Sequence, residues 1–439
     1  MTVSLIVCLS ACAGLIALIL FKPSARIKGH TISIYWLPAF AGGVLLLLSG
    51  VLPVKEAWAG LTASGEMNPL KILAFFLSLT FLSVYLDELG FFRQLSFMLL
   101  RHAKGSKKKL FFLLYAMVSV LTVFTSNDIV VLTFTPFICS FCKEEKISPI
   151  PFLVGEFVAA NTWSMALVIG NPTNVYLAAV TGIGFGEYLS VMWLPTVMAG
   201  LAAFCTLLLI FRKSLSSPIS PVTVKGQVVD RGLLLIGVVH LAACVICLAF
   251  SSYLGVPMWL ASVLFAASLA ICSTVYGAGK RRFRMTEKLL GHSVLRAPWE
   301  LVPFVLSMFL IVLSLQKYGL TDRIAGVLSV GGDGEIWTYG VSSFLAANVI
   351  NNIPMSVLFG GVIGANLGAG ITAQSVYATV IGSNLGAYFT PIGALAGIMW
   401  MGLLKTYGVK FGFKDFVRYG GVVAAMALAF ALLGLWLVL

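Results

Sequence analysis

Long apolar runs dominate this sequence and limit the folds that it can adopt. A run of about 20 apolar residues is long enough to cross the hydrocarbon core of a bilayer as a helix. Such runs lie near residues 2–22, 32–53, 69–92, 151–182, 188–211, 232–251, 255–277, 299–320, 371–403 and 418–438. The sequence therefore predicts an all-α polytopic membrane protein with about ten transmembrane helices.

Composition excludes a soluble globular chain. Of the 439 residues, 59% are hydrophobic and only 10% are charged, and the mean hydropathy is +1.01. The formal net charge of +13 would suggest nucleic acid as a partner of a soluble domain. In a membrane protein the same excess of Lys and Arg is first a topology signal, so we expect a lipid bilayer and no nucleic acid as partner.

Two further apolar stretches, 110–141 and 335–364, carry polar residues in their middles. The polar segments are TSND at 125–128 and NNIP at 351–354. Each apolar arm has about 13 to 16 residues, which is too short to cross the membrane comfortably. We therefore expect two re-entrant hairpins, each with its polar motif at the tip.

The distribution of basic residues supports this topology. With the N-terminus outside the cytoplasm, 25 of the 29 Lys and Arg residues fall on one side of the membrane. Cytoplasmic loops carry such an excess. The expected location is the cell membrane, a bacterial inner membrane, with both termini outside the cytoplasm.

The chain also repeats three landmarks in the same order. Residues 75–90 resemble 304–319, the two hairpin tips follow, and VIGNPTN at 168–174 corresponds to VIGSNLG at 380–386. Each half contains five spans and one hairpin, and an odd number of crossings inverts the second half. Inverted repeats are typical of secondary transporters, whose substrate sites lie between the halves near the midplane.

The repeat divides the chain into two domains. The first inverted repeat covers residues 1–211 with the hairpin 110–141, and the second covers 232–439 with the hairpin 335–364. The polar segment 212–231 between them contains two prolines and is expected to be a cytoplasmic linker.

Glycine and proline predict a helix break inside one span of each half. GNPTN at 170–174 falls within 151–182, and GSNLG at 382–386 falls within 371–403. Unwound backbone exposes carbonyls and half-helix ends that bind ions. The candidate substrate- or ion-binding residues are Thr125, Ser126, Asn127, Asp128, Gly170, Asn171, Pro172, Thr173, Asn174, Asn348, Asn351, Asn352, Pro354, Gly382, Ser383, Asn384 and Gly386.

Asp128 places a carboxylate at the depth of a hairpin tip, which marks it as a functional candidate. Two interpretations are open: the carboxylate carries a proton or pairs with a cation, or it caps a helix that starts at Ile129. The second repeat has Ile353 at the matching position. Other acids, including Glu156 and Glu300, lie nearer to span ends, where snorkelling to the interface is expected.

Together, the TSND and NNIP tips and the GNPTN and GSNLG breaks resemble the ion transporter superfamily. The nearest branch is that of the arsenite permeases and NhaD-type sodium/proton antiporters, alongside citrate-transporter-like permeases. The resemblance implies a scaffold and a transport domain, opposed hairpins, alternating access and often a homodimer.

The resemblance also implies a sodium site. The superfamily's paired Ser-Asn-Thr motifs correspond to Ser126 and Asn127 in one half and to Asn351 and Asn352 in the other. Asp128 and Ile353 replace the Thr of those motifs. This departure argues against assignment as a dicarboxylate/sodium symporter. It favours the branch of the superfamily in which Asp follows Asn.

We therefore expect a secondary active transporter for a small inorganic or organic anion or a metalloid oxyacid, coupled to protons or sodium. The alternative is a sodium/proton antiporter in which Asp128 is the exchanging carboxylate. The sequence contains neither a Walker motif nor HExxH, which argues against a primary pump acting alone and against an intramembrane metalloprotease. An ATPase partner in trans is left open.

Overall fold

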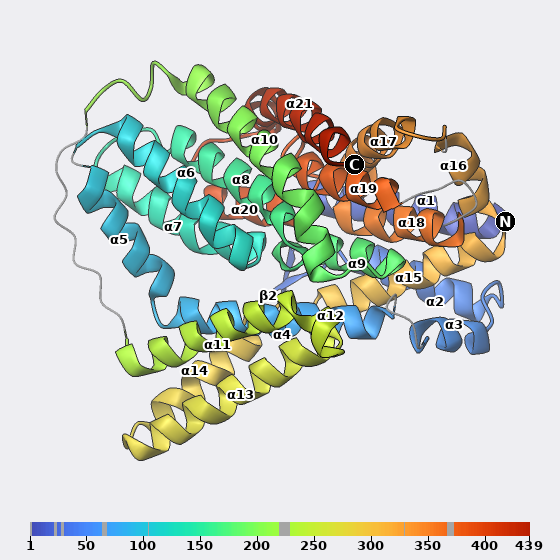
Figure 1. Cartoon of the computed structure of the whole chain (residues 1–439), viewed down its shortest axis with the longest axis horizontal. Helices are drawn as coiled ribbons and strands as arrows, with labels where there is room; N and C mark the ends of the chain where they lie inside the picture. The colour runs from blue at the N-terminus through green and yellow to red at the C-terminus, as the bar shows by residue number, and fades with distance from the viewer. Residues whose placement is uncertain are drawn as a thin grey trace.

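The structure is a computed structural model, and it describes residues 2–21, 24–27, 30–63, 68–103, 105–218, 229–328, 330–366 and 373–439. Helices form nearly all of the regular structure in these ranges (Figure 1). The exception is a short antiparallel pair, β1 (Ser24–Ile27) and β2 (His30–Ser33), between the first two helices. The expected all-α class is confirmed apart from this pair.

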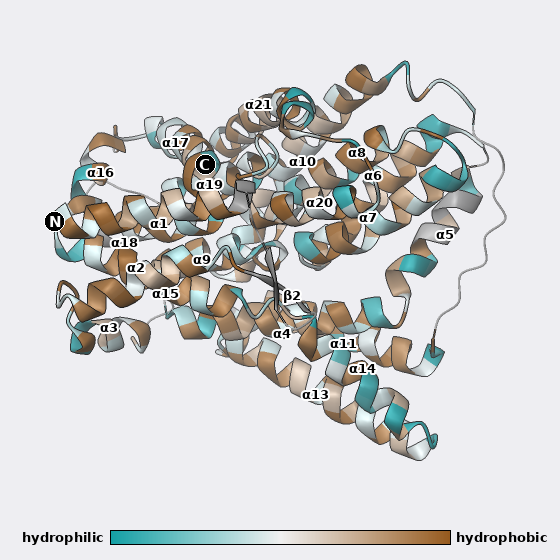
Figure 2. Cartoon of the chain, turned by 180° about the vertical axis from the view of Figure 1, so that it is seen from behind, coloured by the Kyte–Doolittle hydropathy of each residue, from teal (hydrophilic) through white to brown (hydrophobic). Residues whose placement is uncertain are grey.

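Five described helices are long and apolar enough to cross a membrane unaided. They coincide with five of the predicted spans and are α4 (Pro69–Glu88), α10 (Phe185–Phe211), α11 (Arg231–Ala249), α13 (Met258–Gly279) and α21 (Phe413–Val438). Figure 2 shows hydrophobic residues along the helices and hydrophilic residues gathered toward helix ends.

Apart from the first, the other predicted spans are shorter or interrupted, so the described part of the chain does not show ten uninterrupted crossings. α1 (Thr2–Phe21) is continuous, whereas the second predicted span, 32–53, contains α2 (Leu37–Leu48) and is followed by a separate short helix, α3 (Val54–Leu61). α15 (Leu301–Lys317) and α16 (Leu320–Leu328) meet at a bend of 82°. Gly50 and Gly319 have φ values of +69° and +68° at these interruptions, a conformation that glycine adopts without steric cost.

Each predicted hairpin is a pair of adjacent helices joined at its polar motif (Figure 1). The first pair is α6 (Lys107–Phe124) and α7 (Asn127–Glu144), and the second is α17 (Gly334–Ile350) and α18 (Asn352–Asn366). Three of these four helices are longer than the predicted arms, with 18, 18 and 17 residues. α6 and α17 include polar residues at their N-terminal ends, and α7 includes them at both ends.

The two predicted breaks separate four short helices. α8 (Ile150–Trp163) is separated from α9 (Pro172–Thr181), and α19 (Ala373–Gly386) from α20 (Leu395–Thr406). The remaining helices are α5 (Phe91–Ala103), α12 (Ser251–Leu254) and α14 (Phe283–Leu295). The order of elements from α4 to α10 thus recurs from α15 to α21: a helix, a short helix, a helix pair, a broken helix and a long helix.

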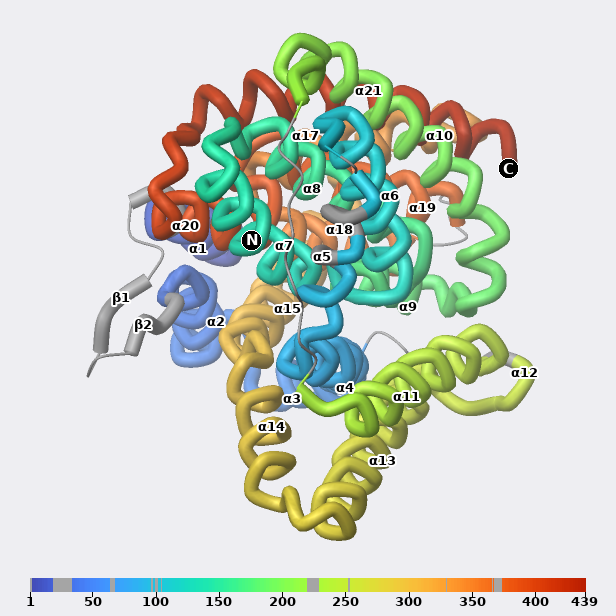
Figure 3. Tube along the Cα trace, turned by 90° about the vertical axis from the view of Figure 1, so that its left-hand side faces the viewer, coloured from blue at the N-terminus to red at the C-terminus, as the bar shows by residue number. Residues whose placement is uncertain are grey.

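α4 lies between two groups of helices (Figure 3). α11, α13 and α14 pack on one side of it, and α7 and α9 lie on the other with the rest of the helix pairs and broken helices. α10 and α21, the last helices of the two recurring series, pack side by side. The helix pairs and broken helices therefore share one part of the molecule.

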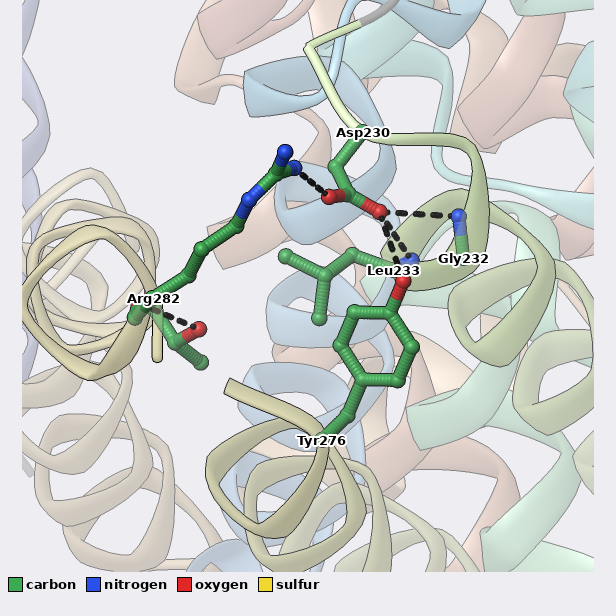
Figure 4. A network of polar contacts seen from close by, with 6 residues as sticks. Asp230, Gly232, Leu233, Tyr276 and Arg282 are labelled. Carbon is green, nitrogen blue, oxygen red and sulfur yellow. Dashed lines mark hydrogen bonds and ion pairs between the residues drawn. The ribbon is translucent and has the colours of Figure 1, made fainter. Parts of the chain in front are cut away.

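A network around Asp230 fixes the group formed by α11, α13 and α14 (Figure 4). One carboxylate oxygen accepts hydrogen bonds from the N–H groups of Gly232 at 2.8 Å and Leu233 at 3.0 Å, and so caps α11. Tyr276 donates to the same oxygen, and Arg282 donates to the other at 2.5 Å. Burial alone would raise the pKa of Asp230, but the hydrogen bonds from Leu233, Gly232 and Arg282 lower it below its ordinary value.

We predict that Asp230→Ala lowers the melting temperature of the detergent-solubilised protein, because loss of a helix cap typically costs about 1 kcal/mol. Asp230→Asn retains a carbonyl oxygen for the two backbone N–H groups and should lose less. Fluorescence-detected thermal unfolding measures both. Equal melting temperatures for wild type and Asp230→Ala would show that this network contributes nothing to stability.

Candidate functional site

The first polar tip joins α6 and α7. Thr125 ends α6, Ser126 is the N-cap of α7, and the helix begins at Asn127 rather than at Ile129 as expected. Asp128 therefore lies within the first turn, and among the described residues nothing donates a hydrogen bond to it. The cap interpretation of Asp128 is not supported by this geometry.

Two oxygens of this tip are buried without a hydrogen-bond partner. They are Oγ of Ser126 and Oδ1 of Asn127, and the described residues around them offer no donor. The amide nitrogen of Asn127 is satisfied, because it donates to Oδ1 of Asn161 at 3.0 Å. Buried polar atoms are nearly always hydrogen-bonded, so such exceptions mark places where a ligand, ion or water can bind.

The second tip is held in an unusual backbone conformation. Asn351 has φ of +74° and ψ of 152°, a region that non-glycine residues rarely adopt. Its amide nitrogen donates to the carbonyl of Ile392 at 2.9 Å, and the N–H of Asn352 donates to the carbonyl of Gly393 at 3.0 Å. Oδ1 of Asn352 is a third buried oxygen without a partner in the described part of the chain. Pro354 lies in the first turn of α18.

The first break occurs where glycine and proline predicted it. Two short 3-10 turns, Ser164–Ala166 and Val168–Gly170, separate α8 from α9. A Cβ atom at Gly170 would lie 2.1 Å from the carbonyl oxygen of Ser164, so only glycine fits. Asn171 then caps α9 by accepting from the N–H and the hydroxyl of Thr173 at 3.2 and 3.0 Å, and Pro172 is the first residue of the helix.

The second break was predicted in the wrong place. Gly382, Ser383, Asn384 and Gly386 all lie within α19, and the chain unwinds only at 387–394. Gly382 serves close packing instead, because a Cβ there would lie 2.6 Å from the carbonyl oxygen of Gly340 in α17. The break coincides with TPIG at 390–393, whose proline removes a backbone donor.

Asn384 joins the two broken helices through a network of buried amides. Its Oδ1 accepts from the hydroxyl of Ser164 at 2.8 Å and from Nδ2 of Asn171 at 3.1 Å. Its Nδ2 donates to Oδ1 of Asn174 at 2.7 Å. Nδ2 of Asn174 in turn donates to the carbonyls of Ser164 and Leu167 in the unwound segment. Backbone carbonyls freed by the first break are thereby satisfied inside the protein.

Sequence reasoning missed two members of this network, Asn161 and Ser164. The hydroxyl of Ser164 also donates to the carbonyl of Asn161 at 2.8 Å, and Asn161 accepts from Asn127 at the first tip. The network thus extends from the first tip to Asn384, and all of these side chains are buried. A lone Asn at 161 within an apolar run was the available signal.

The other predicted residues lie around the second tip and break. Oδ1 of Asn348 accepts from the N–H and hydroxyl of Thr390 at 3.0 and 2.7 Å, so Asn348 stabilises the second break. The hydroxyls of Ser383 and Ser356 lie 3.3 Å apart and link α19 to α18. The structure therefore brings the first tip together with the first break and Asn384, and the second tip together with the second break.

The acidic residues have three different environments. Glu156 was expected near an interface, but it is completely buried and accepts from the hydroxyl of Thr135 at 3.0 and 3.1 Å. Asp87 and Glu88 bind Arg296 at 2.8 and 2.6 Å. Asp128 is half-buried and lies within electrostatic reach of Glu300, in a part of the structure where no basic side chain pairs with it.

A cavity of about 550 Å³ extends along one face of α7. Leu132, Pro136, Ser140 and Glu144 line it at intervals of four residues, and the Asp87–Glu88–Arg296 cluster lies opposite. Asp128 is four residues before Leu132 and so lies on the same helix face, one turn beyond the cavity. Among the described residues no group of three or more His, Cys, Asp or Glu side chains could hold a metal ion.

Apolar helices, interrupted spans and polar residues at helix breaks are common in secondary membrane transporters. Comparison with known proteins identifies the family of this chain. Residues 16–379 match the family described as "Citrate transporter", and the chain belongs to that family. The resemblance to arsenite permeases and citrate-transporter-like permeases is confirmed.

The chain is also similar to individual transporters over nearly its full length. An "Arsenical pump membrane protein" of Escherichia coli is 29% identical over 422 residues, 93% of each chain. A "Putative arsenical pump membrane protein" of Bacillus subtilis is 22% identical over 427 residues, 90% of this chain and 92% of that one. The crystal structure of the Alcanivorax borkumensis YdaH transporter shares the fold, with a TM-score of 0.58 at 16% identity over 99% of this chain and 98% of that chain.

We predict that Asn384→Ala strongly destabilises the protein, because it leaves the buried Nδ2 of Asn171 and Oδ1 of Asn174 without partners, at about 1 to 3 kcal/mol each. Asn366→Ala, at a less buried Asn outside the network, is the matched control. Thermal unfolding in detergent measures both. A melting temperature of Asn384→Ala no lower than that of Asn366→Ala would contradict the structural role of the network.

Proposed function

We propose that this transporter moves a small metalloid oxyacid of the arsenous acid type, bound between the two polar tips and the amide network. The observation that carries the proposal is the set of buried oxygens without partners on Ser126, Asn127 and Asn352. Arsenous acid is uncharged at neutral pH and presents hydroxyl groups that can donate to such oxygens. The names of the arsenical pump relatives point to the same substrate class.

The chemistry of the network favours an uncharged substrate over a carboxylate anion. The network consists of Asn and Ser side chains and contains no Lys or Arg. A di- or tricarboxylate would need guanidinium or ammonium partners to offset its desolvation. A small inorganic or organic anion therefore enters this site only together with a cation.

We further propose that the two halves, 1–211 and 232–439, insert with opposite orientation around the cytoplasmic linker 212–231. The recurring order of elements and the distribution of Lys and Arg support this arrangement. The pairs α6–α7 and α17–α18 are then re-entrant hairpins that enter from opposite sides. Both termini lie outside the cytoplasm, and substrate reaches the tips from each side in turn by alternating access.

Sodium is the proposed coupling ion at the tips, with oxygens of Ser126, Asn127, Asn351 and Asn352 as its ligands. Side-chain carbonyl and hydroxyl oxygens are the ligand type that hard cations prefer. The buried, unpartnered state of three of these oxygens supports the assignment. The strained backbone of Asn351 fits a site that is held open for an ion.

Sodium/proton antiport by Asp128 is the second candidate, favoured by the carboxylate's lack of a basic partner beside Glu300. Reconstituted vesicles separate the two functions. A sodium gradient that changes internal pH in the absence of metalloid favours antiport, whereas metalloid flux without such exchange favours the first proposal.

We predict that Asn127→Ala and Asn352→Ala each reduce arsenite flux by about tenfold or more, since the loss of about 1.4 kcal/mol at the transition state has this effect. Flux is measured in proteoliposomes containing equal amounts of folded protein. Asn366→Ala should transport like wild type. Wild-type arsenite flux in both tip variants would show that the tips do not bind the substrate.

A second prediction tests the inverted arrangement by cysteine labelling, in a background where the exposed thiols Cys205 and Cys272 are replaced by Ala. Lys108→Cys and Lys143→Cys should react with a membrane-impermeant maleimide only from the cytoplasm. Val330→Cys, at an exposed position before α17, should react only from outside. Labelling of positions 143 and 330 from the same side of the membrane would contradict the inverted arrangement of the two halves.

A further inference from the structure

An apolar groove of about 310 Å³ lies between α6 and α10, which both pack against α8 (Figure 1). Leu201 and Phe204 line it from α10. The ring of Phe204 lies edge-on to that of Phe112 in α6, with centroids 5.8 Å apart. The groove residues of α6 recur every four positions, on one face of the helix, and are Phe112, Ala116, Val120 and Phe124.

The groove presents an apolar surface throughout its length. Its two hydroxyl groups are already hydrogen-bonded within the protein, because Tyr115 donates to the carbonyl of Gly200 at 2.8 Å and Ser119 donates to the carbonyl of Tyr115 at 2.7 Å. The indole nitrogen of Trp163 is buried beneath them. A hydrocarbon chain therefore suits the groove better than a polar solute does.

One end of the groove is basic. Lys108 continues the series of groove residues on α6, four positions before Phe112, and Arg212 directly follows the last residue of α10. These helix ends lie side by side, because Nζ of Lys107 donates to the hydroxyl of Ser217 at 2.6 Å. The positive charges of both helices thus lie at the same end of the groove.

The basic residues at this end have no acidic partners. Neither 105–113 nor 205–218 contains an acidic residue. Within the described part of the chain, none of the exposed basic side chains makes an ion pair, and these are Lys108, Lys109, Arg212 and Lys213. They are available to a negative charge from outside the protein.

We propose that this groove binds an anionic phospholipid of the surrounding bilayer, with an acyl chain between α6 and α10 and the phosphate at the basic end. Lipid tails are as apolar as the groove, so the charge of the headgroup selects the lipid. Basic pockets between membrane helices bind anionic headgroups in this way. The inference holds whichever substrate the protein transports.

The length of the groove fits one acyl chain. From Phe112 to Phe124 it spans about 18 Å at 1.5 Å per helical residue. One leaflet of the hydrocarbon core is about 15 Å deep. An acyl chain that starts at the basic end would therefore reach Phe124, the last residue before the first tip.

A lipid in this groove would contact the helices that position the first tip and the first break. Phe124 directly precedes Thr125 of the tip, and Trp163 directly precedes the break at Ser164. The acyl chain fills the space between α6 and α10 and so stabilises their packing. We therefore expect the bound lipid to raise the melting temperature of the protein.

The test is lipid binding to the purified full chain, measured by native mass spectrometry with dioleoyl phosphatidylglycerol and with dioleoyl phosphatidylcholine. We expect the first phosphatidylglycerol to bind more tightly than phosphatidylcholine, and its affinity to fall about tenfold or more in Lys108→Gln/Arg212→Gln. Ala116→Phe, which fills the groove and keeps the charges, should weaken the binding of both lipids. Lys280→Gln/Lys288→Gln removes two exposed charges away from the groove and should bind like wild type.

Equal affinity of the wild type for the two lipids, or wild-type affinity in Lys108→Gln/Arg212→Gln, would overturn the site. Wild-type affinity in Ala116→Phe would show that the acyl chain lies elsewhere and would also overturn it. In the background without Cys205 and Cys272, a disulfide bond between two copies of Val120→Cys would show that a second copy of the chain covers the groove. That result would likewise contradict the lipid site.

Discussion

A helix that breaks inside an apolar layer must satisfy its backbone groups within the protein, and the rest of this structure depends on how that is done. Asn174 donates to the freed carbonyls of Ser164 and Leu167, and Asn384 fixes Asn174 from the opposite broken helix. These hydrogen bonds tie the first break to α19, the helix that precedes the second break. This constraint places polar side chains at the centre of an otherwise apolar molecule.

The tips complete this arrangement but are not fully satisfied by it. The first tip is tied to the network through Asn127 and Asn161, whereas the second tip is held by the second break, through Asn351 and the carbonyl of Ile392. Three side-chain oxygens remain without partners among the described residues, although the backbone around them is well held. A rigid frame with open acceptors is suited to binding a small hydroxylated solute or a cation.

The sequence predicted the tips and the first break because their signals are local. A polar segment within an apolar run marks the position of a tip directly. Glycine and proline close together interrupt a helix at the position where they occur. The second break was misplaced because Gly382 serves close packing against α17, a contact that spacing cannot reveal. The burial of Glu156 and the role of Asn161 depend on which neighbouring helix faces each side chain, and that is set by tertiary structure.

The most direct test of the account is a structure of the protein with antimonite, an electron-rich analogue of arsenite, located by its anomalous scattering. The account predicts antimony between the two tips, within hydrogen-bonding reach of Ser126, Asn127 and Asn352 through its hydroxyl groups. Antimony bound only at cysteine thiols, or found away from the tips at saturating concentration, would contradict it.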